Sequence, residues 1–183
     1  MYWNMYFQTK FESKMAAKKL LILNKKQIQQ KIDRMGYQIL EDNLNETELI
    51  MAGIIDRGYT IAKRLKKVLE SISAIKVTLM KIELDKDSTH FQANTDVPIG
   101  EASNKVVILV DDVLNSGRTL AYGLGVFLNI PLKKLRTLVL IDRSHRSFPV
   151  SPDYTGLELA TILKEHVDVV LDEKAEEDAV YLR

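Results

Sequence analysis

The stretch VVILVDDVLNSGRTL, residues 106–120, constrains the fold of this chain more than any other segment. Five apolar residues are typical of a buried strand, and two carboxylates, Asp111 and Asp112, follow them directly. A short polar turn then leads through Gly117 to an expected helix at residues 119–128. A buried strand that passes through a small polar turn into a helix is typical of α/β proteins with a parallel sheet.

Strands and helices are expected to alternate along most of the chain. This order predicts an α/β fold with a doubly wound, mostly parallel sheet and helices on both faces. Short β-like runs in the tail predict a small C-terminal β-rich hood, and residues 85–104 have the lack of periodicity of a long functional loop. The expected helices are 25–43, 59–73 and 119–128, the expected strands are 48–53, 77–84, 106–110 and 136–141, and the β-like runs are 157–162, 167–171 and 179–182.

The composition narrows the class of protein. A chain of 183 residues with 46% apolar residues suits one globular domain, which we place at residues 19–183, after an N-terminal arm at residues 1–18 that we expect to be flexible. A net charge of +1 argues against a general polyanion binder. The absence of cysteine excludes disulfides, thiolate metal sites and cysteine nucleophiles. No apolar run approaches the ~20 residues of a membrane span, so we expect a cytoplasmic protein without a membrane partner.

The polar turn after the strand at residues 106–110 has the features of an anion site. Free backbone N–H groups at a helix start, a glycine and hydroxyl groups can together bind a phosphate. Asp111 and Asp112 would repel a phosphate, but they can accept hydrogen bonds from sugar hydroxyls or hold a hard cation. A ligand such as ribose 5-phosphate suits the whole stretch, and the alternative is an acidic helix start without a ligand. The cradle residues are Asn115, Ser116, Gly117, Arg118 and Thr119.

Two further loops are expected at the same edge, because the carboxyl ends of parallel strands meet there. The first is GIIDRG, residues 53–58, where a guanidinium and exposed N–H groups between two glycines can hold a pyrophosphate. It lacks the Gly-Lys-Ser/Thr of ATP-binding loops. The second is IDRSHRSFP, residues 141–149, which is either a basic surface loop or part of the site.

The stretch VILVDDVLNSGRT resembles the phosphoribosyl pyrophosphate (PRPP) signature of the type I phosphoribosyltransferases. With IDRSHRSFPVSPDYTGLELAT and HVDVVLDE, the chain is most similar to the PyrR family of bifunctional pyrimidine operon regulators with uracil phosphoribosyltransferase activity. The resemblance covers residues 20–182. It implies the type I phosphoribosyltransferase fold. It also implies transfer of the phosphoribosyl group from PRPP to a nucleobase, with uracil as the first candidate, and release of pyrophosphate.

The resemblance also implies Mg²⁺ as cofactor, a nucleoside monophosphate as product, and a homo-oligomer, either a dimer or a tetramer. Two alternatives stay open: an RNA-binding transcription attenuator that senses pyrimidine nucleotides, and a phosphoribosyltransferase for another base such as a purine. The implied roles are catalytic for Asp111, Asp112, Arg57 and Lys86, metal-binding for Asp111 and Asp112, phosphate-binding for residues 115–119, Asp56 and Gly58, base-binding for His166 and Val167, and RNA-binding for Arg34, Arg143, His145 and Arg146.

The chain departs from the pattern of the family at three places. Asp56 stands before the arginine of the pyrophosphate loop, where the regulators usually have an uncharged residue. The flexible loop of the family typically begins with a Tyr-Arg-Asp-Asp-like run, and here the aromatic residue is missing and Lys86 replaces the arginine. Tyr37 and Asp42 occupy positions on the first helix where a histidine and a cation would be expected in an RNA-binding member. The last departure argues against RNA binding.

Overall fold

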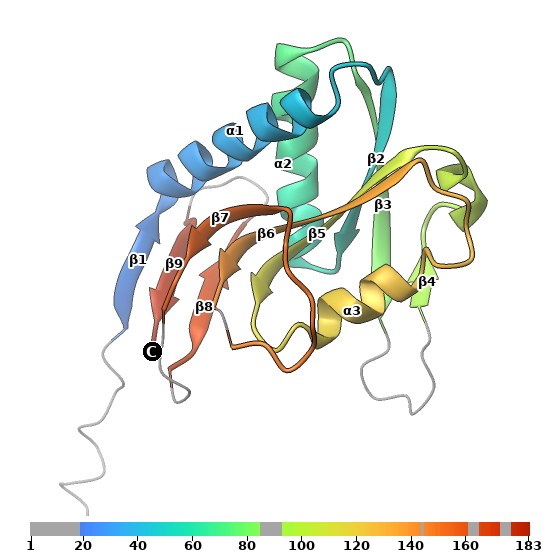
Figure 1. Cartoon of the computed structure of the whole chain (residues 1–183). Coiled ribbons are helices and arrows are strands. Elements are labelled where there is room, and N and C mark those ends of the chain that lie inside the picture. Colours follow the sequence, from blue (N-terminus) through green and yellow to red (C-terminus); the bar gives the residue numbers. More distant parts are fainter. Residues whose placement is uncertain (1–18, 85–92, 144, 161–164, 173–176) are drawn as a thin grey trace, which may run out of the picture.

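The computed structural model describes residues 19–84, 93–143, 145–160, 165–172 and 177–183 (Figure 1). The predicted arm at residues 1–18, the first part of the predicted loop at residues 85–104, and with it Lys86, lie outside the described residues. None of the helices in the described part is long and apolar enough to cross a membrane.

The main sheet has six strands in the order β4-β3-β2-β5-β6-β7. Its strands pair in parallel from β3 to β7, and only β4 at one edge is antiparallel to its neighbour. The prediction of a mostly parallel sheet is therefore confirmed. The strands are β2 (Glu48–Ile54), β3 (Lys76–Leu84), β4 (Ala93–Thr95), β5 (Val106–Leu114), β6 (Lys134–Asp142) and β7 (Tyr154–Glu158).

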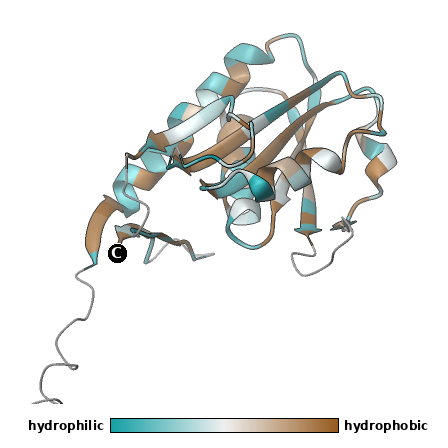
Figure 2. Cartoon of the chain, turned by 60° about the horizontal axis from the view of Figure 1, so that its bottom comes forward, coloured by the Kyte–Doolittle hydropathy of each residue, from teal (hydrophilic) through white to brown (hydrophobic). Residues whose placement is uncertain are grey.

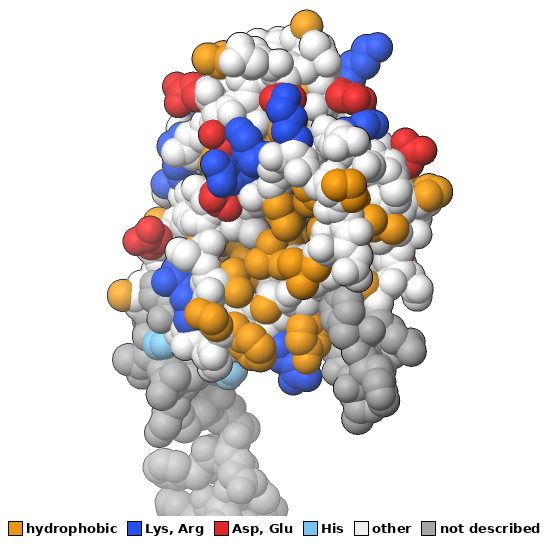
Figure 3. All heavy atoms as spheres, turned by 45° about the vertical axis from the view of Figure 1, so that its right-hand side comes forward, with side chains coloured by type: hydrophobic (Ala, Val, Ile, Leu, Met, Phe, Trp, Pro, Cys, Tyr) orange, Lys and Arg blue, Asp and Glu red, His pale blue; other side chains and the backbone are white. Residues whose placement is uncertain are grey.

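Helices cover both faces of this sheet, as predicted. Helices α1 (Lys25–Asp42) and α2 (Arg57–Ile72) pack on one face, and α3 (Arg118–Gly125) packs on the other with the short 3₁₀ helix η2 (Ile99–Ala102) beside it. Figure 2 shows apolar strands between helices whose outer surfaces are polar. On the side of α3 the cover is shorter, and Figure 3 shows hydrophobic side chains gathered on that face.

A second sheet forms the hood, with three antiparallel strands in the order β1-β9-β8. They are β1 (Leu20–Asn24), β8 (Val167–Val170) and β9 (Ala179–Leu182). The predicted C-terminal hood is confirmed: its runs at residues 167–171 and 179–182 form β8 and β9, and β1 from the N-terminal part adds a third strand. The predicted run at residues 157–162 overlaps β7, which belongs to the main sheet instead. The sequence LLILN is short and has no alternation of apolar and polar residues, so it carries little signal for a strand.

Other boundaries also differ from the prediction. Strand β5 does not end at Val110 but continues through Asp111 and Asp112 to Leu114, because β6 continues to pair with it. The predicted loop at residues 85–104 contains β4 and η2 in its described part. The two aspartates therefore lie near the end of a paired strand, which fixes their backbone.

A buried ion pair joins the hood to α2. The guanidinium of Arg64 donates to both carboxylate oxygens of Asp178 and, over 2.6 Å, to the carbonyl oxygen of Asp172. Only 2% of the Asp178 side chain and 11% of the Arg64 side chain are exposed. The pair fixes the segment before β9 against α2, the helix that begins at the predicted pyrophosphate loop.

Candidate active site at the carboxyl edge of the sheet

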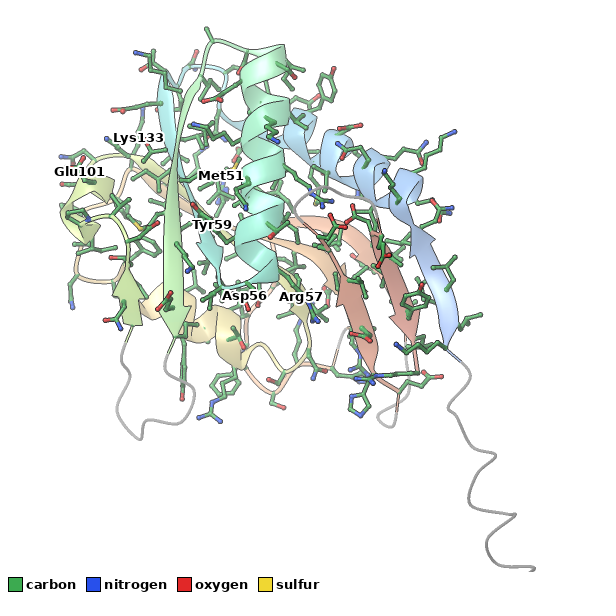
Figure 4. All side chains as sticks on the ribbon, turned by 180° about the vertical axis from the view of Figure 1, so that it is seen from behind. Met51, Asp56, Arg57, Tyr59, Glu101 and Lys133 are labelled. Atoms are coloured by element: carbon green, nitrogen blue, oxygen red, sulfur yellow. The ribbon has the colours of Figure 1, made fainter. Side chains whose placement is uncertain are left out.

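A polar cavity of about 400 Å³ lies where β2 and β5 end and α2 and α3 begin. It brings together two of the three predicted loops. Figure 4 shows Asp56 and Arg57 side by side at the start of α2, at the end of the sheet opposite to Lys133. The lining residues are Ile54, Ile55, Asp56, Arg57, Asp111, Asp112, Val113 and Thr119.

The two aspartates are oriented by the backbone of their own strand. One carboxylate oxygen of Asp111 accepts the N–H of Asp112 over 2.9 Å, and one oxygen of Asp112 accepts the N–H of Val113 over 2.9 Å. Asp111 is 7% exposed. The second oxygen of Asp112 lies 3.5 Å from Nη1 of Arg57. Carboxylates held in this way are preorganised acceptors for ligand hydroxyls.

The carboxylate oxygens of Asp111 and Asp112 also fit Mg²⁺ as ligands. This ion prefers oxygen ligands, and it is commonly held by one or two carboxylates while water and substrate phosphates complete its shell. Among the described residues no group of three or more His, Cys, Asp or Glu side chains could hold a metal ion alone. Asp111 and Asp112 would therefore share the ion with a bound ligand and with water.

Glycines allow the predicted pyrophosphate loop to approach the aspartates closely. The peptide bond between Ile55 and Asp56 is cis, and α2 begins at Arg57. A Cβ atom on Gly58 would lie 2.5 Å from the carbonyl oxygen of Val110 and 3.0 Å from Cα of Asp111. Both neighbours are backbone atoms of β5, so they cannot turn away as a side chain would. Gly58 thus sets the distance between the loop and the aspartates.

We expect Gly58→Ala to push the start of α2 away from β5. The loss of stability should be about 1–3 kcal/mol, because the extra methyl group meets a rigid strand. Urea unfolding and nucleotide titration would measure the loss of stability and of binding. Gly100→Ala is the matched control, since no atom lies within 4 Å of the added Cβ. Equal stability of the two variants would contradict the role given to Gly58.

The predicted phosphate cradle is a tight turn that the third loop braces. Gly117 has φ +84°, a left-handed conformation that favours glycine. The carbonyl oxygen of Ser116 accepts the N–H groups of Ser147 and Phe148 over 2.9 and 3.0 Å. The N–H of Arg118 donates to Oγ of Ser116 over 3.3 Å, and the Arg118 guanidinium lies 5.2 Å from the centre of the Tyr122 ring. The loop after β6 therefore supports the turn.

The predicted base segment lies on β8, at one edge of the hood. His166 and Arg183 exchange two backbone hydrogen bonds, of 2.6 and 3.0 Å. In an antiparallel pair, hydrogen-bonded residue pairs alternate with pairs that are not hydrogen-bonded. The N–H and C=O of Val167, which is paired with Leu182, therefore do not bond to β9. Among the described residues β8 is an edge strand, so the N–H and C=O of Val167 point away from β9, towards the side on which no described strand pairs. Both groups are thus available to a ligand edge.

Asp168 comes from this same strand and faces Arg57, which lines the cavity. Its Oδ1 lies 3.8 Å from Nη2 of Arg57. No local spacing relates residue 168 to the loop at residues 53–58, so the sequence carries no signal for this contact. One guanidinium thus connects the predicted base segment with the predicted pyrophosphate loop.

The arginines predicted to bind RNA are engaged within the chain. Arg143 is buried, at 4% exposure, and its guanidinium donates to the carbonyl oxygen of Glu165. Its prediction as part of an exposed basic face is therefore corrected, because its charge ties the loop after β6 to the base segment. Arg146 pairs with the buried Asp142. Arg34 donates to the carbonyl oxygens of Thr155 and Gly156 over 2.7 and 2.8 Å.

Asp42, which occupies the position of an expected cation, has a structural role. Its carboxylate accepts hydrogen bonds from the Tyr154 hydroxyl over 2.8 Å and from Nε of Arg136 over 3.1 Å, and it pairs with Lys134. Burial raises the pKa of Asp42, but these hydrogen bonds outweigh burial and hold the pKa below its usual value. The carboxylate thus joins the end of α1 to β6 and β7.

Comparison with known proteins gives a consistent result. Residues 21–174 match the phosphoribosyl transferase domain family. The chain is similar to the bifunctional protein PyrR of Microcystis aeruginosa, with 35% identity over 169 residues that cover 88% of this chain and 95% of the relative. For the bifunctional protein PyrR of Synechocystis sp., the identity is 34% over 176 residues, with coverage of 92% and 98%.

The fold is similar to solved structures of the same class. The structure of a mutant hypoxanthine phosphoribosyltransferase from Trypanosoma cruzi, complexed with the product IMP, superposes with a TM-score of 0.73. The identity is 20%, and the match covers 91% of this chain and 85% of the other. At this identity the likeness concerns the fold alone.

Proposed function

Because the chain belongs to the phosphoribosyltransferase family and is itself a phosphoribosyltransferase, we propose that it transfers the phosphoribosyl group of PRPP to uracil and releases pyrophosphate. The observation that carries this proposal is the cavity in which Asp111, Asp112 and Arg57 meet beside the glycine turn at Gly117. PRPP has a diol, a 5-phosphate and a pyrophosphate, and each has a complementary group there.

In this proposal the chain acts by positioning and by charge. Asp111 and Asp112 accept hydrogen bonds from the ribose hydroxyls, and residues 115–119 bind the 5-phosphate. As the bond from C1 to the pyrophosphate oxygen breaks, its electron pair leaves with the pyrophosphate, and the sugar gains positive charge. The base nitrogen forms the new bond to C1, and its proton passes to the released pyrophosphate or to water. Arg57 stabilises the negative charge that grows on the leaving group.

Mg²⁺, when bound with the ligand at Asp111 and Asp112, would neutralise part of the pyrophosphate charge. Asp56 lines the same cavity and adds a negative charge near that group. The hydrogen bond and charge interaction with Glu83 raise the pKa of Lys81, and the charge of Asp56 adds to the effect. The catalytic role of Lys86 stays a prediction.

The backbone of Val167 supports a pyrimidine as the acceptor. Its N–H can donate to a uracil carbonyl and its C=O can accept from the N3–H of uracil, so one residue matches one edge of the base. His166 precedes it, and its backbone is held by Arg183. A purine phosphoribosyltransferase is the alternative, and it would require a deeper base site.

The test is a product assay with Mg²⁺ and PRPP, in which uracil, cytosine, hypoxanthine and guanine are compared. We expect UMP from uracil and at least about tenfold lower kcat/KM for the other bases, which corresponds to about 1.4 kcal/mol. Turnover of a purine alone would overturn the base assignment. A lack of PRPP binding in calorimetry would overturn the proposed reaction itself.

RNA binding is the second candidate, because the relatives are named bifunctional. The intramolecular contacts of Arg34, Arg143 and Arg146 weigh against it, although Tyr37 is 55% exposed and can stack on a base. We expect the affinity for a pyrimidine-operon leader hairpin to exceed that for a scrambled hairpin by less than about threefold at physiological salt. A gel-shift titration measures this ratio.

Tight and sequence-selective binding that UMP enhances would contradict this expectation. If Arg146→Gln then abolished that binding, RNA regulation would be the primary function. The parent protein without UMP and with a scrambled hairpin provides the baseline for both comparisons.

A further inference from the structure

Arg57 lies between two carboxylates that come from different sheets. Its Nη1 is 3.5 Å from Oδ2 of Asp112 on β5, and its Nη2 is 3.8 Å from Oδ1 of Asp168 on β8. The Arg57 side chain is 49% exposed, whereas those of Asp112 and Asp168 are 18% and 20% exposed. The two nitrogens that would bind a phosphate in a fork are thus both directed at protein carboxylates.

Asp168 has a second cation on its other side. Nζ of Lys19 lies 3.5 Å from Oδ2 of Asp168 and 5.5 Å from the centre of the Tyr181 ring. Tyr181 is the cross-strand partner of Asp168 in the pairing of β8 with β9. Lys19 is therefore held beside Asp168 by the hood itself, independently of the pyrophosphate loop.

We propose that Asp168 is a positioning residue whose carboxylate competes with the pyrophosphate group for Arg57. When Arg57 turns to the ligand, the Asp168 carboxylate stays paired with Lys19. This inference rests on the proposed function. A guanidinium binds phosphate best when both of its terminal nitrogens are available, and the carboxylate of Asp168 must give up one of them. The same carboxylate repels an incoming polyanion as long as its charge is only partly neutralised.

This change of partner by Asp168, from Arg57 to Lys19, links the pyrophosphate end of the proposed site with its base end. Asp168 follows Val167, whose free backbone groups are proposed to bind the base, so a shift of Asp168 towards Lys19 moves or stiffens that strand. Occupation of the pyrophosphate end then changes the affinity for the base, and the base changes the affinity for the pyrophosphate by the same factor. A salt bridge between partly exposed groups contributes little to stability, so the main effect of Asp168 falls on ligand binding.

The experiment is calorimetric titration of pyrophosphate with Mg²⁺, and separately of UMP, which lacks the pyrophosphate group. Asp168→Asn should tighten pyrophosphate binding about three- to tenfold, and Lys19→Gln should weaken it by a similar factor. In an Arg57→Gln background, Asp168→Asn should produce less than half of its gain. The midpoint of thermal unfolding should stay near the parent value in the Asp168 and Lys19 variants, and their UMP affinity should change less than their pyrophosphate affinity. Lys133→Gln, which removes a cation paired with Glu46 at the opposite end of the sheet, is the matched control (Figure 4).

The outcomes distinguish a failure of this inference from a failure of the proposed function. If the parent binds pyrophosphate but Asp168→Asn binds it equally or more weakly, the competition is absent and the proposed function stands. An unchanged Lys19→Gln variant would likewise overturn the inference, even if Asp168→Asn failed to fold. If the parent binds neither PRPP nor pyrophosphate, the proposed function fails and this inference fails with it.

Discussion

Replacement of both Asp111 and Asp112 with asparagine is expected to lower kcat/KM at least about a hundredfold, the scale of losing one preorganised electrostatic contact in an active site. The asparagine side chains can still accept the N–H groups of Asp112 and Val113 that orient the aspartates. What is lost is negative charge beside the sugar that becomes cationic, together with the carboxylate oxygens that fit Mg²⁺. Steady-state kinetics and PRPP titration would measure both losses.

The fold should be nearly unchanged in this double variant, which thermal unfolding checks. Asp153→Asn is the control, because the Asp153 carboxylate also accepts a backbone N–H, from Thr137 over 2.8 Å, but it does not line the cavity. If the double variant turned over PRPP as fast as Asp153→Asn, the assignment of the site would be wrong.

Arg64→Ala is expected to lower the free energy of unfolding by about 3–5 kcal/mol, because the carboxylate of Asp178 would stay buried without a partner. The Asp178 side chain is 2% exposed, and Arg64 donates to both of its oxygens. The carbonyl oxygen of Asp172 would lose a donor as well. Urea unfolding of the parent and the variant would give this difference.

A double variant tests the cause of that loss. Arg64→Met combined with Asp178→Leu removes both charges, so it should cost less than Arg64→Ala alone. Lys133→Ala breaks a pair in which the lysine side chain is 55% exposed, and this control should cost less than about 1 kcal/mol. If Arg64→Ala cost no more than this control, the buried pair would not hold the hood to α2.

Local patterns in the sequence predicted the elements of the central fold well. The apolar residues Ile28, Ile32 and Ile39 predicted one buried face of α1, and all three are fully buried. The pattern of apolar residues placed the end of β5 too early. Such a pattern indicates which side chains are buried, but it does not indicate which residues pair with a neighbouring strand. Asp111 is acidic, but it still pairs with Val139 on β6.

Contacts between distant parts of the chain could not be read in this way. The pairing of Arg57 with Asp168, and of Arg64 with Asp178, depends on how the hood sits over α2. No spacing along the sequence encodes that arrangement. The predicted loops did meet at one edge, because parallel strands place their carboxyl ends together. The resemblance to a family supplied roles that the local patterns left open.

Strand β1 leaves the ribosome long before its partner β9 has been made. The segments that form β2, β3, β5 and β6 come between the two, so the parallel sheet can assemble while β1 is still unpaired. The cost of closing so long a loop falls on the hood, which should therefore form last during synthesis. Until then β1 presents Leu23, which is 4% exposed in the folded protein, on a strand with two open edges. A stalled or truncated nascent chain would thus be prone to aggregate at its first strand, even when its central sheet is already native.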